Sequence, residues 1–156
     1  MTLRVICPLA VVSATIEALR ESGACGHEGI VLWLGHRRSD RVEIVQAYVP
    51  EHSARHDMFH IPPSGMRKLQ THLRTHRWMI GAQVHSHPAL AFHSRADDEW
   101  AIVRHVGALS IVAPHFARHL TPDSFLGDCA TYELDARNRW RKVEIAEIAA
   151  LCEILP

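Results

Sequence analysis

Long apolar runs and paired cysteines are both missing from this sequence of 156 residues. A helix that crosses a bilayer needs roughly 20 consecutive apolar residues, and no stretch of the chain approaches that length. The four cysteines, Cys7, Cys25, Cys129 and Cys152, lie far apart, so the chain has neither a CxxC redox motif nor a zinc ribbon. We therefore expect a protein of the reducing cytoplasm that is not bound to a membrane.

A net charge is also missing, because 17 lysines and arginines balance 17 aspartates and glutamates. Without a positive field, the chain has no general attraction for nucleic acid or for an anionic membrane. Partner selection must then come from a local site. The composition does contain 13 histidines, but abundant histidine alone does not indicate metal binding.

Length and composition predict one folded domain over residues 1–156, because domains typically hold about 100–200 residues. The apolar share of 47% and the charged share of 22% are those of soluble globular proteins. The chain should therefore bury a core of ordinary size.

Strand and helix patterns alternate along the sequence, which predicts an α/β sandwich. Hairpins are expected around 36–40 and 135–139, and the polar segment 50–63 is expected to be a loop that can shape a binding site. The unbroken apolar run at 30–34 predicts a strand buried on both faces. The expected strands are 3–7, 30–34, 41–49, 78–84, 107–112, 125–134 and 140–143, and the expected helices are 9–21, 64–76, 94–106 and 145–154.

The clearest chemical pattern is His85-Ser86-His87-Pro88, directly after the predicted strand 78–84. Successive side chains of a strand point to opposite faces, so His85 and His87 share a face and are about 6.5–7 Å apart along the chain. Pro88 cannot donate a ladder hydrogen bond, so the strand ends there. Two imidazoles at the end of a sheet can converge on one metal ion.

Ser94-Arg95-Ala96-Asp97 begins the next predicted helix and supplies a third ligand. Carboxylates are favoured in the first turn of a helix, and Asp97 can face the end of the sheet. Catalytic zinc takes three protein ligands and keeps a fourth position for water. One Zn²⁺ ion held by His85, His87 and Asp97 fits this pattern. Ser-x-x-Asp is also the pattern of a helix capping box, in which both side chains only satisfy backbone donors, and both interpretations stay open.

Glu28 is the candidate general base, because a water nucleophile needs a proton acceptor beside it. It stands just before the apolar run 30–34, where a charged residue is otherwise costly. Taken alone, it could equally be an ordinary carboxylate at the end of a strand. Ser94 is the candidate donor to the oxyanion that develops during hydrolysis.

Two further histidine pairs, His72 with His76 and His115 with His119, have the spacing of one helix face. Neither first histidine is followed by the glutamate that an HExxH zinc motif requires. We therefore interpret these four residues as solvated or packing histidines.

At these positions the sequence resembles the JAMM family, the catalytically competent JAB/MPN metalloproteases, and in particular its bacterial members. The family pattern is Glu-x-x-Gly-x-Leu-x-Gly, followed by His-x-His-Pro and Ser-x-x-Asp. The segment 28–35 matches the ends of the first element, with Val31 and Trp33 where glycine and leucine are usual. The rest of the pattern is matched by His85, His87, Pro88, Ser94 and Asp97.

The loop 88–93, between His87 and Ser94, is one residue shorter than is usual in the family. Asp98 directly follows Asp97, but the Ser-x-x-Asp spacing selects Asp97 as the ligand. The likeness extends from Glu28 to about Leu134, and the stretch 92–117 looks like bacterial JAB domains found beside ubiquitin-activating-type enzymes.

The resemblance implies a JAB/MPN-like (cytidine-deaminase-like) sandwich of a mixed β-sheet flanked by helices. It also implies a zinc peptidase that cuts a peptide or isopeptide bond at the C-terminus of a ubiquitin-like protein, with ubiquitin-activating-type and conjugating-type enzymes as further partners. Deconjugation and precursor trimming both fit, as does hydrolysis of a sulfur-carrier protein or a small peptide. The alternative of a different class is a non-catalytic MPN-like scaffold.

Overall fold

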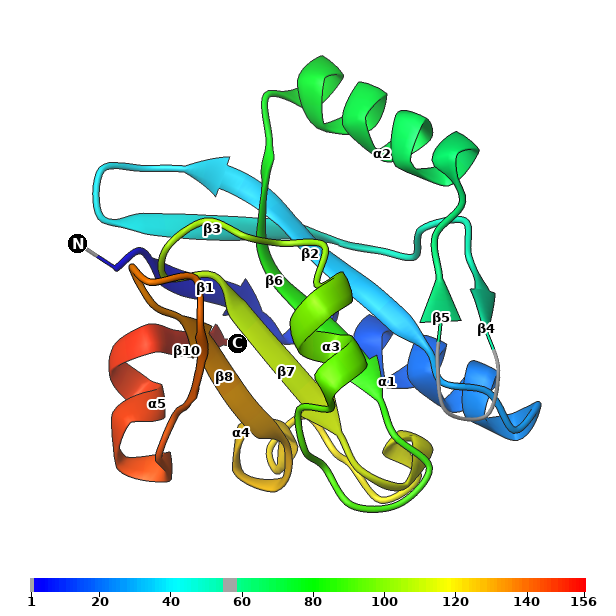
Figure 1. Cartoon of the computed structure of the whole chain (residues 1–156). Helices are drawn as coiled ribbons and strands as arrows, with labels where there is room; N and C mark the ends of the chain where they lie inside the picture. Colours follow the sequence, from blue (N-terminus) through cyan, green and yellow to red (C-terminus); the bar gives the residue numbers. More distant parts are fainter. Residues whose placement is uncertain (1, 55–58) are drawn as a thin grey trace.

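The computed structural model describes residues 2–54 and 59–156, and within them a curled, mixed sheet of eight strands forms the centre of the protein (Figure 1). In spatial order the strands are β10 (Cys152–Leu155), β1 (Arg4–Pro8), β3 (Arg41–Tyr48), β2 (Ile30–Arg37), β6 (Met79–Ser86), β7 (Leu109–Ala113), β8 (Ala130–Leu134) and β9 (Trp140–Lys142). A separate ribbon pairs β4 (Ser53–Ala54) with β5 (Phe59–His60). The helices are α1 (Leu9–Ala24), α2 (Pro63–His76), α3 (Arg95–Trp100), α4 (Phe125–Asp128) and α5 (Ile145–Leu151), with a 3-10 turn, η1 (His115–Ala117).

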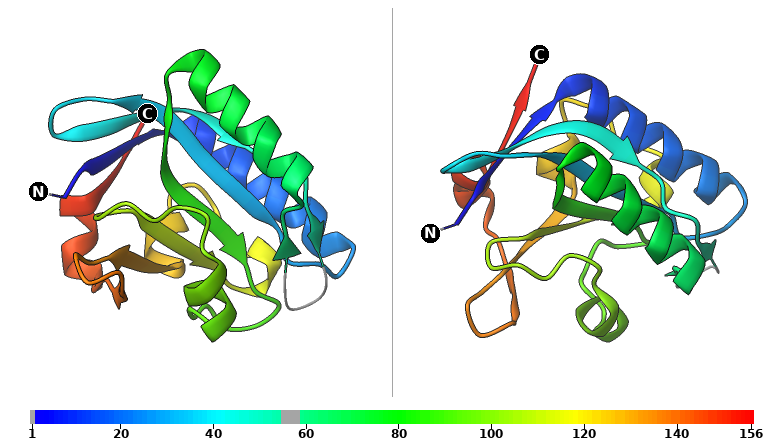
Figure 2. Two further views of the ribbon diagram at one scale, coloured as in Figure 1. Left: turned by 45° about the horizontal axis from the view of Figure 1, so that its top comes forward. Right: turned by 90° about the horizontal axis from the view of Figure 1, so that it is seen from above.

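Strand β2 is buried on both faces because its alternate side chains enter two different cores. Val31 and Trp33 join the larger core, which includes residues of α1. The even-numbered residues from Ile30 to Leu34 pack instead with Leu69 of α2. Figure 2 shows α1 and α2 on opposite faces of the sheet. The prediction of a strand buried on both faces is confirmed.

Gly35 lies in β2 where the register with β3 shifts. A Cβ atom there would lie 2.1 Å from the backbone oxygen of Glu43, a distance that no side chain can occupy. Gly35 is therefore required by the close approach of the two strands.

The helix predicted over 94–106 ends at Trp100. Ala101 is extended, with φ −55° and ψ 133°. The N–H groups of Ile102 and Val103 then donate to Oε1 of Gln83, at 2.8 and 3.3 Å. A side-chain acceptor in β6 thus replaces the carbonyls of a continued helix, which the spacing of apolar residues does not reveal.

Three other predicted boundaries are wrong. The strand predicted over 125–134 begins at Ala130, because 125–128 form α4 and bury Phe125 against Trp33, with ring centroids 5.8 Å apart. The helix predicted over 145–154 ends at Leu151, and the last residues form β10, which pairs in parallel with β1. The predicted loop 50–63 contains β4 and β5; its residues 55–58 lie outside the described part of the chain.

Within the described ranges, no helix has both the length and the apolar character that crossing a membrane requires. The cysteines are free thiols, and Cys7, Cys129 and Cys152 are buried. Burial raises the pKa of the Cys152 thiol to about 12, so this side chain is neutral and unreactive at physiological pH.

Candidate metal centre

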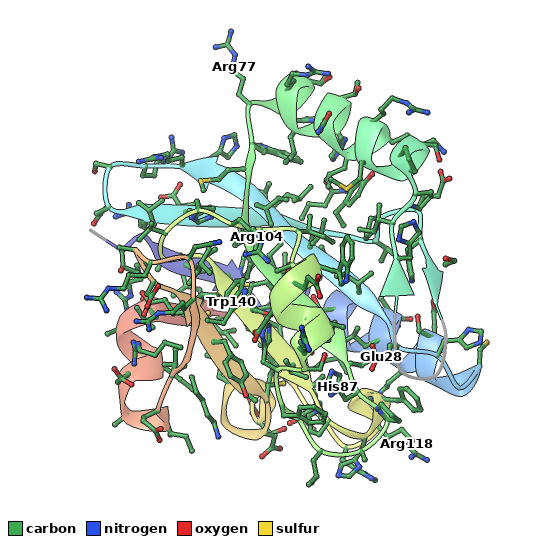
Figure 3. All side chains as sticks on the ribbon, in the orientation of Figure 1. Glu28, Arg77, His87, Arg104, Arg118 and Trp140 are labelled. Carbon is green, nitrogen blue, oxygen red and sulfur yellow. The ribbon has the colours of Figure 1, made fainter. Side chains whose placement is uncertain are left out.

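The antiparallel register of β2 and β6 brings Glu28 opposite His87. Ile30 pairs with His85, and the same register continued by two residues places Glu28 against His87. Glu28 Oε1 lies 3.8 Å from His87 Nε2, and the two side chains are side by side in Figure 3. Because Glu28 is only 3% exposed, its carboxylate is held within the protein and not in solvent.

His85 and His87 project from the same face of β6, as the alternation of a strand predicts. Their ring centroids lie 5.2 Å apart, and both residues are buried. The strand ends at Ser86, two residues before Pro88. Beyond the strand, the His87 N–H donates to the carbonyl oxygen of Ala113 at 2.9 Å, which fixes the second imidazole at the end of the sheet.

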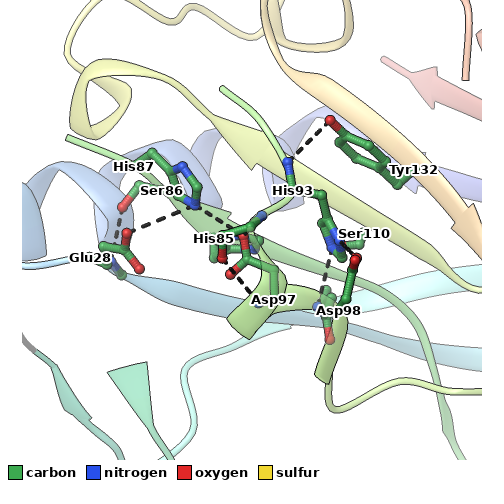
Figure 4. Close-up of polar contacts among 12 residues, drawn as sticks. Glu28, His85, Ser86, His87, His93, Asp97, Asp98, Ser110 and Tyr132 are labelled. Atoms are coloured by element: carbon green, nitrogen blue, oxygen red, sulfur yellow. Dashed lines mark hydrogen bonds and ion pairs between the residues drawn. The ribbon is translucent and has the colours of Figure 1, made fainter. Parts of the chain in front are cut away.

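Asp97 faces both imidazoles from the first turn of α3 (Figure 4). Its Oδ2 lies 3.1 Å from His85 Nε2 and 3.2 Å from His87 Nε2. The same oxygen accepts a hydrogen bond from the Ser94 N–H at 2.8 Å, and Ser94 Oγ accepts from the Asp97 N–H at 3.1 Å. The capping box and the inward-facing carboxylate are therefore two aspects of one arrangement.

The three side chains fit a small divalent cation. Their ligand atoms all lie within 4.8 Å of one another. A tetrahedral ion with bonds of about 2.0–2.2 Å sets its ligand atoms about 3.3–3.6 Å apart. The separations of 3.1 and 3.2 Å from Asp97 to the two histidines are close to that value. Two imidazoles and one carboxylate also leave a divalent cation with a net positive charge.

The electrostatics of the site favour a positive charge at its centre. Burial alone would raise the pKa of Asp97, but hydrogen bonds from His85 and His87 and from the Ser94 N–H outweigh it and hold that pKa well below its usual range. Burial alone would lower the pKa of His87, but Asp97 and then Glu28 outweigh it and raise that pKa. A proton and a metal ion would therefore compete for the same place.

The neighbouring carboxylate of Asp98 points away from the two imidazoles. It is 56% exposed and contacts His93 Nδ1. The structure thus brings Asp97, and not Asp98, to His85 and His87, in line with the Ser-x-x-Asp spacing despite the short loop 88–93.

Sequence reasoning missed a second group of polar residues on the same face of the sheet (Figure 4). His93 Nε2 lies 3.0 Å from Ser110 Oγ, which lies 3.2 Å from Gln83 Nε2. Gln83 precedes His85 by two residues, so the alternation that selects the histidines also selects this face for Gln83. His93 gave no comparable signal, because it is one of 13 histidines in the chain.

The other predicted histidine pairs lie in other surroundings. His72 and His76 pack around Trp78, with ring centroids 5.5 and 4.4 Å from it. His115 and His119 lie 5.9 Å apart, beginning at the turn η1. Their interpretation as packing and surface histidines agrees with these contacts.

Comparison with known proteins gives relatives in sequence and in fold. No protein-family model matches the chain. The solution structure of protein DSY2949 from Desulfitobacterium hafniense is similar in fold, with a TM-score of 0.68 and 17% identity over 97% of this chain and 92% of that one. The probable metalloprotease y4jG of Sinorhizobium fredii is 34% identical over 146 residues, which are 90% of this chain and 88% of that protein. The chain belongs to the family of this probable metalloprotease.

Proposed function

We propose that this chain is a zinc metalloprotease of the JAMM (JAB/MPN) type that hydrolyses a peptide or isopeptide bond at the C-terminus of a ubiquitin-like protein. The observation that carries the proposal is the meeting of buried His85, His87 and Asp97, with buried Glu28 beside His87. Membership in the family of a probable metalloprotease supports the reaction class. The ubiquitin-like substrate and the JAB/MPN fold rest on the motif resemblance of these residues.

Zinc is the ion that best combines this donor set with hydrolysis. Imidazole and carboxylate both bind zinc, and catalytic zinc sites characteristically use three such protein ligands. His85, His87 and Asp97 would hold it. The chemistry that such an ion supplies is Lewis acidity, which polarises a carbonyl oxygen and lowers the pKa of a bound water to about 7.

Glu28 would move the proton of the reaction. Its carboxylate is held beside His87 by the register of β2 and β6, on the same side as the ligands. As the oxygen of water bonds to the carbonyl carbon, Glu28 would take the proton from that water. It would then give the proton to the nitrogen that departs when the C–N bond breaks. One carboxylate thereby serves first as base and then as acid.

Ser94 would support the developing oxyanion. Its Oγ accepts the N–H of Asp97, so the hydroxyl proton can still donate outward. The capping geometry holds that hydroxyl at the start of α3, directly beside the ligand Asp97. A donor fixed in this way needs no reorganisation during the reaction.

Glu28→Gln tests the proposal, with wild type and Glu17→Gln, an exposed glutamate of α1, as controls. The substrates are a ubiquitin-like protein with a C-terminal extension, the same protein joined to lysine, a sulfur-carrier fusion and short peptides. We expect Glu28→Gln to bind one equivalent of zinc by metal analysis and to cut the ubiquitin-like substrates slower than wild type by a factor of roughly 100 to 10,000. Glu17→Gln should cut at the wild-type rate.

Three results would contradict parts of the proposal. Wild-type rates in Glu28→Gln would show that this carboxylate is not the base. Cleavage of only the carrier fusion or only the peptides would show that the substrate is a sulfur-carrier protein or a small peptide, and not a ubiquitin-like protein. A wild-type protein purified without chelators that holds no zinc would favour the scaffold alternative.

A further inference from the structure

A line of hydrogen bonds runs beside the candidate metal centre, on the same face of the sheet (Figure 4). Gln83 of β6 and Ser110 of β7 are register partners, and their side chains meet at 3.2 Å. Ser110 Oγ continues to His93 Nε2 at 3.0 Å, and His93 Nδ1 contacts the carboxylate of Asp98 on α3. Gln83, Ser110, His93 and Asp98 are called the polar line below.

The direction of every hydrogen bond in the polar line follows from its first member. Gln83 Oε1 accepts two backbone N–H groups, so the amide cannot be turned and its Nε2 must donate to Ser110. Ser110 then donates its own proton to His93 Nε2. A neutral imidazole whose Nε2 accepts carries its proton on Nδ1, where it faces the Asp98 carboxylate. Each donor in the polar line therefore faces an acceptor, and reversing one hydrogen bond would leave a neighbouring group without its partner.

The polar line holds a helix that has little stability of its own. Helix α3 spans six residues, whereas isolated helices shorter than about 12 residues are marginal in water. Asp98 attaches its first turn to the sheet through His93. Gln83 attaches the segment just after its end through Ile102 and Val103. Asp97 directly precedes Asp98, the first of these two attachments, in the same first turn of α3.

His93 is itself fixed from several sides. Its ring lies 4.7 Å from that of Tyr132 and 5.2 Å from that of Trp140, measured between centroids. Its backbone N–H donates to the Tyr132 hydroxyl at 3.1 Å. Its side chain is only 3% exposed. A histidine held this firmly can transmit the position of the sheet to α3.

We propose that His93 is a positioning residue for the metal centre: by joining Ser110 in the sheet to Asp98 on α3, it holds Asp97 at the separation from His85 and His87 that a metal ion requires. The inference rests on the metal site of the proposed function, but not on the substrate or on the cleavage reaction. Partners of this kind, one step behind the ligands, typically change metal affinity by about 10–100-fold.

Two full-length variants each remove the contact between His93 and Asp98, one at the buried residue and one at the exposed residue. His93→Phe keeps a ring against Tyr132 and Trp140 but removes both polar contacts. Asp98→Ala removes the α3 end of the line at an exposed position, so the core is untouched. Asp123→Ala, which removes an exposed carboxylate elsewhere, is the matched control. Zinc affinity is measured by competition with a chromogenic chelator, and the melting temperature of each metal-free variant is measured separately.

We expect His93→Phe and Asp98→Ala each to lower zinc affinity by about 10–100-fold. The double variant should lose little more than the larger single loss, because both changes cut one link. The visible spectrum of the Co²⁺-loaded protein should change in both variants, and His93→Asn, whose amide can still reach Asp98, should recover part of the affinity. Asp123→Ala should behave as wild type.

Zinc affinities within twofold of wild type in both folded variants would overturn the inference, even if their melting temperatures fall, since His93 would then be merely structural. Additive losses in the double variant would also overturn it. A wild-type protein that binds no zinc would overturn it together with the proposed metal site. A protein that shows the expected affinities but cleaves no substrate would overturn the proposed function alone.

Discussion

A single oxygen of Asp97 serves both the helix start and the two histidines. Asp97 Oδ2 accepts the Ser94 N–H at 2.8 Å and lies within 3.2 Å of both imidazoles. The charge of the carboxylate matters to the histidines, whereas the cap needs only an acceptor oxygen. The two roles can therefore be separated by substitution.

We predict that Asp97→Asn keeps the folded structure but loses zinc. The asparagine oxygen can still accept the Ser94 N–H, whereas the lost negative charge weakens the ligand set. The expected loss of affinity is more than about 100-fold, since even partners behind the ligands cost 10–100-fold. Ser94→Ala should show the converse: zinc affinity near wild type and a loss of about 1 kcal/mol in stability from the missing cap. Chelator competition and thermal unfolding measure the two effects, and tight zinc binding by Asp97→Asn would refute the assignment.

The side chains of the candidate centre can be predicted from the sequence where strand alternation or motif spacing determines their direction. Strand alternation places His85 and His87 together, and motif spacing selects Asp97. The partners of His93 could not be predicted in this way. Ser110 and Asp98 reach it from separate elements, and only the packing of α3 on the sheet brings them within hydrogen-bond distance.

The hairpin of β8 and β9 is the clearest example of an element closed by one side chain. Asp135 Oδ1 accepts the N–H groups of Arg137 and Arg139, at 2.8 and 2.9 Å. The Arg139 N–H is the main cause of a lowered pKa for Asp135; desolvation opposes it, and the Arg137 N–H adds to it. The negative charge is therefore favoured more in the folded state than in the unfolded state.

This difference predicts a pH dependence of stability. The unfolded pKa of aspartate is about 3.9, and the folded pKa lies below it. The contribution of Asp135 is therefore complete above about pH 4 and is lost as the pH falls through the folded pKa. Asp135→Asn keeps the acceptor oxygen but cannot take up a proton. The difference in melting temperature between metal-free wild type and Asp135→Asn should shrink from pH 6 to pH 2, and a constant difference would contradict this account.

Elements with a strong local signal match their predictions, whereas those set by tertiary contacts do not. The buried strand predicted at 30–34 and the hairpin predicted around 135–139 are set by neighbouring residues, and both predictions are confirmed. The end of α3 depends on Gln83, which is distant in sequence. Strand β10 depends on the free edge of β1, and its apolar residues alone fit a helix equally well.

At the scale of the whole molecule, the candidate centre joins three parts of the chain. Glu28 precedes β2, the two histidines lie in and directly after the last residues of β6, which ends at Ser86, and Asp97 lies in the first turn of α3. An ion bound by His85, His87 and Asp97 would link the end of β6 to α3 only in the folded state. Binding of this kind raises the free energy of unfolding by about 2.7 kcal/mol when the free ion is 100 times its dissociation constant.

We therefore predict that removing the metal lowers the melting temperature. For a domain of this size, about 2.7 kcal/mol corresponds to a shift of roughly 5–10 °C. Scanning calorimetry with zinc and with a chelator measures it. Asp97→Asn should melt at the same temperature under both conditions, and a wild-type protein without any shift would contradict a site that spans these elements.

Alternate side chains of strand β2 pack into two hydrophobic cores, and the proposed base, Glu28, lies just before the strand. A larger residue in place of Val31 or Leu32 has no free space to enter, so the strand would shift and carry Glu28 with it. During evolution, new substrate preferences should therefore arise in the surface segments around the centre, such as 89–92. The buried residues of the sheet should change little, because a substitution there would also displace Glu28 and slow the proposed reaction.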